Sequence, residues 1–218
     1  IATDTTVNVV KDSDSTKGRN GAENGTVTIN GSTDDVEVTV AVITYAGSDY
    51  YYGFTSVADA IKFAKDGDTI TLIRDVELSE ILVIDKAITL DGNGHKLTST
   101  AGRAINVSTA NGVTIKNLTI NATGERAINV IQGATNITIE NVVATSANYT
   151  VNVAGSAPKA VVTIKNSTLT GLNTVNVASA GAKVTIAAST INCNDNNTTA
   201  GESYAALCLN KDGVGASI

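Results

Sequence analysis

The sequence predicts an all-β protein in the form of a parallel β-helix, in which each coil of the chain stacks on the coil before it. One observation behind this is a three-residue motif that recurs at nearly constant spacing. Another is the composition: of 218 residues one is Pro, none is Trp and two are Phe, while Thr, Asn, Val and Ile are frequent. Because β-branched residues and turn formers dominate, we expect little helix.

The repeat is defined by two apolar residues around a central Asn. It occurs at 105–107, 128–130, 151–153 and 175–177, so its steps are 23, 23 and 24 residues. A fifth copy, Leu207-Cys208-Leu209, is delayed by eight or nine extra residues that fall in 194–202. Two more strand-like segments follow each triplet, as 113–116 and 118–120 follow the first. Apolar residues alternate in all of them, which indicates three short strands per coil of about 23 residues around a shared core.

An Asn separates the second and third segments in three coils, at Asn117, Asn141 and Asn166. Asn tolerates tight turns, and its amide can hydrogen-bond the turn backbone and its counterpart in the next coil. We therefore predict a structural ladder of these three residues, called the corner asparagines below. The ladder should stop where Ala188 takes their place.

The stacked triplets, the corner asparagines and the variable loop after the third segment together resemble the right-handed parallel β-helix of the pectate-lyase-like superfamily. Residues 54–97, with the runs TSVADAIKFAKDGDTI and DGNGHKL, resemble an N-terminal capped β-helix module of secreted and cell-surface proteins of Firmicutes. The resemblance implies a right-handed, single-stranded β-helix. It also implies a bacterial, extracellular protein that is secreted or attached to the cell wall or cell surface.

A capping helix is expected ahead of the first coil. Apolar residues at 57, 60, 61 and 64 recur at helical spacing, Thr55 or Ser56 can cap the N-terminus, and Gly67 can stop the helix. This helix would plug the end of the solenoid, which otherwise exposes core and strand edges. We divide the chain into a β-rich segment 1–48, either an appendage or strands laid on the cap, and a capped β-helix 49–218. We expect the natural protein to continue beyond residue 218, where another strand should begin.

Enzymes of the resembled superfamily carry Asp, Lys, Arg and often calcium on the outward face of the first strand. In this chain, alternation places on that face Asn106, Asn129, Asn152 and Asn176, called the strand asparagines below, followed by Cys208. Uronate abstraction needs a base and glycoside hydrolysis a pair of carboxylates, and the column holds neither. We therefore expect no catalytic residues there, and the strand asparagines form either a polar binding row or a structural stack.

Loop residues flank this face and are the expected contacts of any ligand bound to it. They are Glu125, Arg126, Tyr149, Glu202 and Tyr204.

Cys193 and Cys208 are the only cysteines. A disulfide between them would close a loop of about 15 residues, worth roughly 3 kcal/mol. Alternation, however, places Cys208 outward and Cys193 inward, so both a disulfide and two free thiols remain open. The oxygen-rich run 192–197 is the one calcium candidate, but it has a single carboxylate and lacks the spacing of a calcium loop. We expect no other cofactor, since the lone His95 makes no metal site.

Charge and hydropathy narrow the partners. A formal charge of −6 and a pI near 4.7 argue against nucleic acid, and no apolar run is long enough for membrane insertion. The leading hypothesis is a non-enzymatic bacterial cell-surface or secreted protein, adhesin-like or a stalk that binds glycans or a host or cell-surface protein. The alternative is a polysaccharide lyase or hydrolase, or a degenerate relative of one, with Glu125 and Arg126 in its site.

Overall fold

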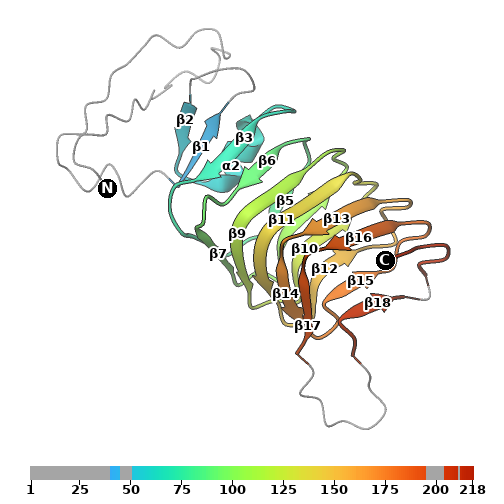
Figure 1. The fold of residues 1–218 in the computed structure, drawn as a ribbon. Helices are drawn as coiled ribbons and strands as arrows, with labels where there is room; N and C mark the ends of the chain where they lie inside the picture. The colour runs from blue at the N-terminus through green and yellow to red at the C-terminus, as the bar shows by residue number, and fades with distance from the viewer. Residues whose placement is uncertain (1–39, 45–50, 195–203, 211) are drawn as a thin grey trace, which may run out of the picture.

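The structure is a computed structural model that describes residues 40–44, 51–194, 204–210 and 212–218. The chain winds through about five turns of a parallel β-solenoid, with about 23 residues per turn. Figure 1 shows the coils side by side in chain order, from β3 at one end to β18 at the other. The predicted all-β parallel β-helix is confirmed.

Two sheets run along the solenoid. The triplet sheet has six parallel strands, which are β5 (Leu82–Ile84), β8 (Arg103–Ser108), β10 (Arg126–Ile131), β12 (Tyr149–Val153), β15 (Val175–Val177) and β18 (Leu207–Leu209). The second sheet has 12 strands, which are β1 (Ala41–Thr44), β2 (Tyr51–Phe54), β3 (Thr69–Leu72), β4 (Val76–Leu78), β6 (Thr89–Asp91), β7 (Lys96–Ser99), β9 (Thr114–Ala122), β11 (Ile137–Thr145), β13 (Val161–Lys165), β14 (Thr168–Gly171), β16 (Lys183–Ala187) and β17 (Thr190–Cys193).

The register of the triplet sheet follows the repeat read from the sequence. Asn129 pairs with Asn106 on one side and with Asn152 on the other, and Asn176 pairs with Cys208 of the delayed fifth copy. The expectation of three separate strands per coil does not hold throughout. β9 and β11 each run for nine residues through the second and third segments, whereas β13 and β14 are separate strands.

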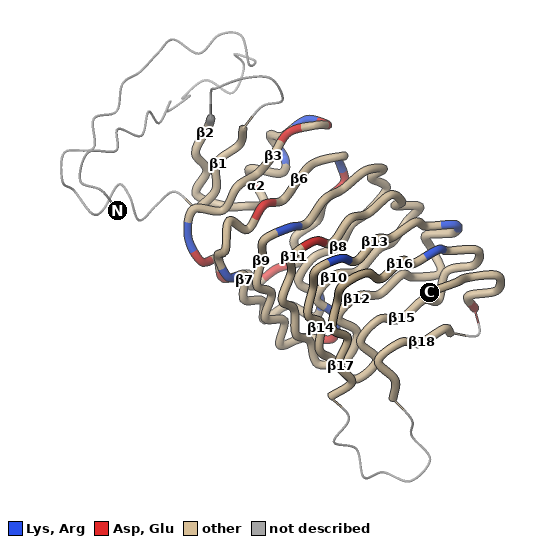
Figure 2. Tube along the Cα trace, in the orientation of Figure 1, with Lys and Arg blue, Asp and Glu red and all other residues tan. Residues whose placement is uncertain are grey.

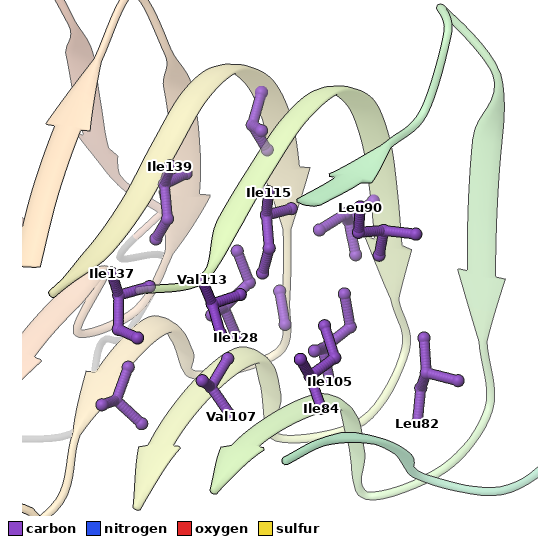
Figure 3. Packing of buried hydrophobic residues seen from close by; sticks show 14 of the residues in the cluster. Leu82, Ile84, Leu90, Ile105, Val107, Val113, Ile115, Ile128, Ile137 and Ile139 are labelled. Carbon is purple, nitrogen blue, oxygen red and sulfur yellow. The ribbon is translucent and has the colours of Figure 1, made fainter. Parts of the chain in front are cut away.

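The core fills the space between the sheets with apolar columns (Figure 3). Ile105 of β8 stacks on Leu82 of β5 and beneath Ile128 of β10, and all three side chains are buried. β9 and β11 contribute Ile115 and Ile139 from the facing sheet. Burying one such side chain fully contributes about 1.5–3 kcal/mol, so each coil is stabilised by its neighbours rather than by its own contacts.

The helix α2 (Val57–Phe63) covers the first coil, where it contacts β1, β2, β3 and β5. The Oγ of Ser56 caps it by accepting a 3.0 Å hydrogen bond from the N–H of Asp59. Val57, Ala60 and Ile61 are buried, as their spacing predicted. The helix ends before Gly67 because Ala64 already has extended backbone angles (φ −59°, ψ 153°).

Lys86 fixes the other end of this helix. Its Nζ donates hydrogen bonds to the carbonyl oxygens of Ile61 at 2.8 Å, Lys62 at 2.6 Å and Ala64 at 2.8 Å. Cations are favourable at helix C-termini, where carbonyl groups lack partners within the helix. A side chain from the first coil therefore ties the cap to the solenoid.

Part of segment 1–48 lies on this cap. β1 pairs antiparallel with both β2 and β3, so residues 41–44 are a strand added to the sheet. Residues 1–39 and 45–48 of the predicted β-rich segment lie outside the described residues.

Candidate functional site

The strand asparagines lie on the side of the triplet sheet that faces away from the core. In β5, Leu82 and Ile84 are buried, whereas Val83 between them is 46% exposed. Val83 is the register partner of Asn106, so the column that begins at Val83 points outward. The predicted direction of these side chains is therefore correct.

Although they point outward, the strand asparagines are buried, with only 1–9% of each residue exposed. The Nδ2 of Asn129 donates to Oδ1 of Asn106 at 2.9 Å, and that of Asn152 to Oδ1 of Asn129 at 2.7 Å. The Nδ2 of Asn176 donates to Oδ1 of Asn152, also at 2.7 Å. The residues two positions before each of these asparagines are also buried; they are Ala104, Ala127, Thr150 and Thr174. Of the two alternatives, the geometry is that of a structural stack, with its amides turned to one another.

The stack has two different ends. The Oδ1 of Asn176 is buried and lacks a hydrogen-bond partner among the described residues. Cys208 lies above it in register, and a thiol is a weak donor. At the opposite end, Asn106 sits above Val83, which can neither donate nor accept. An acceptor is therefore left over at one end of the row.

Three of the predicted loop contacts come together beside this sheet. The guanidinium of Arg126 lies 5.4 Å from the ring centroid of Tyr149 in a cation–π arrangement. Its Nη2 lies 3.3 Å from Oε1 of Glu125. Tyr149 stacks on Arg126 because the two are register partners in β12 and β10.

Sequence reasoning missed Arg103, the register partner of Arg126 in β8. Two guanidinium groups on adjacent strands repel each other. The Nε atoms of both are buried without a hydrogen-bond partner, and Arg103 has no ion-pair partner among the described residues. The triplet alignment could have found it, since each Arg stands two residues before its triplet. We call Arg103, Glu125, Arg126 and Tyr149 the arginine edge.

The other two predicted contacts lie near the delayed fifth copy of the repeat. Tyr204 is half-buried three residues before β18, and Glu202 lies outside the described residues.

The two cysteines are free thiols, and both are half-buried. The Sγ of Cys193 lies 3.1 Å from the carbonyl oxygen of Leu172. Cys208 follows Asn176 in the outward column, whereas Cys193 has the parity of the core-side Ile191. The disulfide is absent from the structure, where the two side chains leave their strands on opposite sides.

The corner asparagines form a second ladder. All three have left-handed backbone angles, with φ between 52° and 53°, which Asn adopts more readily than most residues. The Nδ2 of Asn141 donates to Oδ1 of Asn117 at 2.8 Å, and that of Asn117 to Oδ1 of Asp91 at 3.0 Å. The ladder is thus confirmed for Asn117 and Asn141, while no rung between described residues reaches Asn166.

Ion pairs run beside this ladder on the same sheet. Lys116 Nζ lies 3.2 Å from Asp91 Oδ2, and Lys165 Nζ lies 3.0 Å from Glu140 Oε1. Burial alone would raise the pKa of Asp91, but hydrogen bonds from the Asn93 backbone N–H and the Asn117 amide, together with Lys116, lower it below its usual value.

The described part of the chain contains neither a candidate metal site nor a candidate membrane-spanning helix. No group of three or more His, Cys, Asp or Glu side chains there could hold a metal ion, and residues 195–197 of the calcium candidate lie outside it. Among the same residues, no helix has the length and apolar character needed to cross a bilayer.

Comparison of the chain with protein-family models, with curated proteins and with solved structures found no match. The class of protein is therefore defined by the fold itself, a capped parallel β-solenoid with stacked asparagines.

Proposed function

We propose that this chain is part of a non-enzymatic, extracellular bacterial protein, a right-handed β-helix of the pectate-lyase-like kind. It acts as an adhesin-like stalk that binds a glycan or a cell-surface protein. The observation that carries the proposal is the strand-asparagine stack. These amides occupy the column where the resembled enzymes keep acids and bases, and a buried amide that bonds its neighbours cannot exchange protons with a substrate.

The arginine edge supports binding. Arg103 and Arg126 bring two positive charges together, and among the residues that the structure describes Glu125 pairs only with Arg126. An anionic or polar group on a ligand would relieve the repulsion between the two guanidinium groups. Tyr149 beside them offers an aromatic face, and Arg and Tyr are enriched among residues that dominate binding energy.

The test combines a glycan array with a screen for lyase and hydrolase activity on pectins and host glycans. We expect binding without turnover, and we expect Arg126→Ala and Tyr149→Ala each to weaken it about tenfold or more, as at a binding hot spot. Lys159→Ala, at an exposed position in another loop, is the matched control. If the chain turns over a substrate and Glu125→Ala abolishes this activity, the chain is an enzyme instead. If it binds no glycan and no surface protein, its function is that of a structural spacer.

A further inference from the structure

A trough lies along the bend of the second sheet, away from the arginine edge. It has a volume of about 390 Å³, within the size range of small-molecule sites. Three successive coils line it, with the residues Asn93, Gly94, Asn117, Leu118, Thr119, Asn141 and Val143.

The backbone explains why the surface is hollow here. β9 and β11 each change direction at one left-handed residue, Asn117 and Asn141 respectively, so the strand turns within its own length. The first coil turns at Asn93 and Gly94, with φ of 51° and 82°. A Cβ on Gly94 would meet no atom within 4 Å, so the trough is open at this turn.

The lining carries no charge. It consists of three amides, one hydroxyl, one glycine and two aliphatic side chains. The nearest charged residues on the same strands are occupied, because Lys116 pairs with Asp91 and Lys165 with Glu140. Figure 2 shows charged residues only sparsely along these strands. Lys96 of β7 is the register partner of Thr119 but does not itself line the trough, so the lining supplies no counter-charge to an ion.

Val143 is the unusual member of the lining. Its register partners are Thr119 below and Thr168 above, so it interrupts an outward column of threonines. Its side chain is 51% exposed, and it lies where the trough is lined by amides. An aliphatic side chain among hydrogen-bonding groups gives one apolar contact surrounded by donors and acceptors.

We propose that this trough is a second binding site, for a short segment of a neutral glycan. The corner ladder uses one N–H of Asn117 and one of Asn141, and one lone pair of the Asn117 oxygen. Each side-chain amide has two N–H donors and two lone pairs, so the remaining ones match sugar hydroxyl groups, which also donate and accept. The C–H face of a sugar ring would pack on the exposed side chain of Val143. Successive sugar rings of a linear glycan would lie along the three coils. The proposal shares with the proposed function only the assignment to carbohydrate binding, since none of its residues belongs to the arginine edge.

Affinity should be low, with a Kd on the order of 1 mM, because no aromatic platform is present. The experiment is an NMR titration of the ¹⁵N-labelled 218-residue chain with cellotriose, mannotriose and chitotriose. Trigalacturonate and an uncharged tripeptide are the comparison ligands. We expect at least one neutral trisaccharide to shift the backbone amides of Asn117, Thr119, Asn141 and Val143.

Val143→Lys should raise the Kd of that trisaccharide about tenfold or more, by filling the trough with a charged chain. Val161→Lys is the matched control, because Val161 is 39% exposed on β13 and does not line the trough. Shifts confined to the arginine edge would overturn the trough and leave the proposed function intact. Trough shifts with the tripeptide or trigalacturonate alone would overturn the ligand class, and no trough shift with any ligand would overturn the site.

Discussion

Replacement of Asn129 by Ala tests whether the strand asparagines stabilise the solenoid as a connected row. Asn129 donates to Asn106 and accepts from Asn152, so its loss leaves a buried acceptor and a buried donor unpaired. Each buried group left unsatisfied costs about 1–3 kcal/mol, which gives about 2–6 kcal/mol for Asn129→Ala. Asn106→Ala removes only one hydrogen bond and should cost about half as much.

The assay is urea unfolding followed by circular dichroism, with midpoints compared at constant m-value. Asn192→Ala, at an exposed position of β17, is the control and should change stability by no more than about 0.5 kcal/mol. Equal losses for Asn129→Ala and Asn106→Ala would refute the connected row. So would a loss for Asn129→Ala below about 1 kcal/mol, because that is the smallest cost of one orphaned group.

At the Asn176 end of the row, the same reasoning predicts a substitution that stabilises the chain. Cys208→Asn places an amide donor above the unpaired Oδ1 of Asn176 and should stabilise the chain by about 1 kcal/mol. Cys208→Val, which has no donor, is its control. An equal gain from both variants would show that the new hydrogen bond is not the cause.

Two further predictions concern the corner of the coil. Ala188 has φ of 49° where the preceding coils have Asn, so Ala188→Asn should stabilise by about 1 kcal/mol, measured by urea midpoint, whereas Asn166→Ala should destabilise. The lowered pKa of Asp91 means that its contribution is complete above about pH 4, near the pKa of an unfolded chain, and is lost as pH falls through the lower folded pKa. In Asp91→Asn, the free energy of unfolding should therefore fall less steeply as the pH is lowered below about 4. An unchanged pH dependence in this range would contradict the prediction.

The sequence predicted the fold well because stacking repeats the same contacts in every coil. The pairing of Ile105 with Ile128, and of Asn106 with Asn129, follows from aligning the triplets, since register partners are equivalent residues. The boundaries within a coil were harder to predict. Asn117 bends β9 without ending it, because a left-handed residue can turn a strand while both halves keep their pairing.

The candidate site was predicted less completely. Alternation gave the side of the strand on which Asn129 lies, but alternation does not show what covers a side chain. The amides above and below it and the small residues beside it make it buried. Arg103 was overlooked because it stands outside the triplet, and only the coil-to-coil register places it next to Arg126. The trough at Val143 depends on the backbone angles at the corners of three coils, and composition and spacing do not show that these corners leave a hollow.

The hydrogen bonds of the strand asparagines all point the same way. Each amide N–H reaches back to the carbonyl of the coil before it, from Asn176 through to Asn106. The row therefore has a chemical polarity, because its end at Asn176 presents an amide oxygen whereas its end at Asn106, nearer the cap, presents an amide N–H. A further coil added after Asn176 could extend the row only with a donor, which is what an Asn at this position supplies in each of the preceding coils.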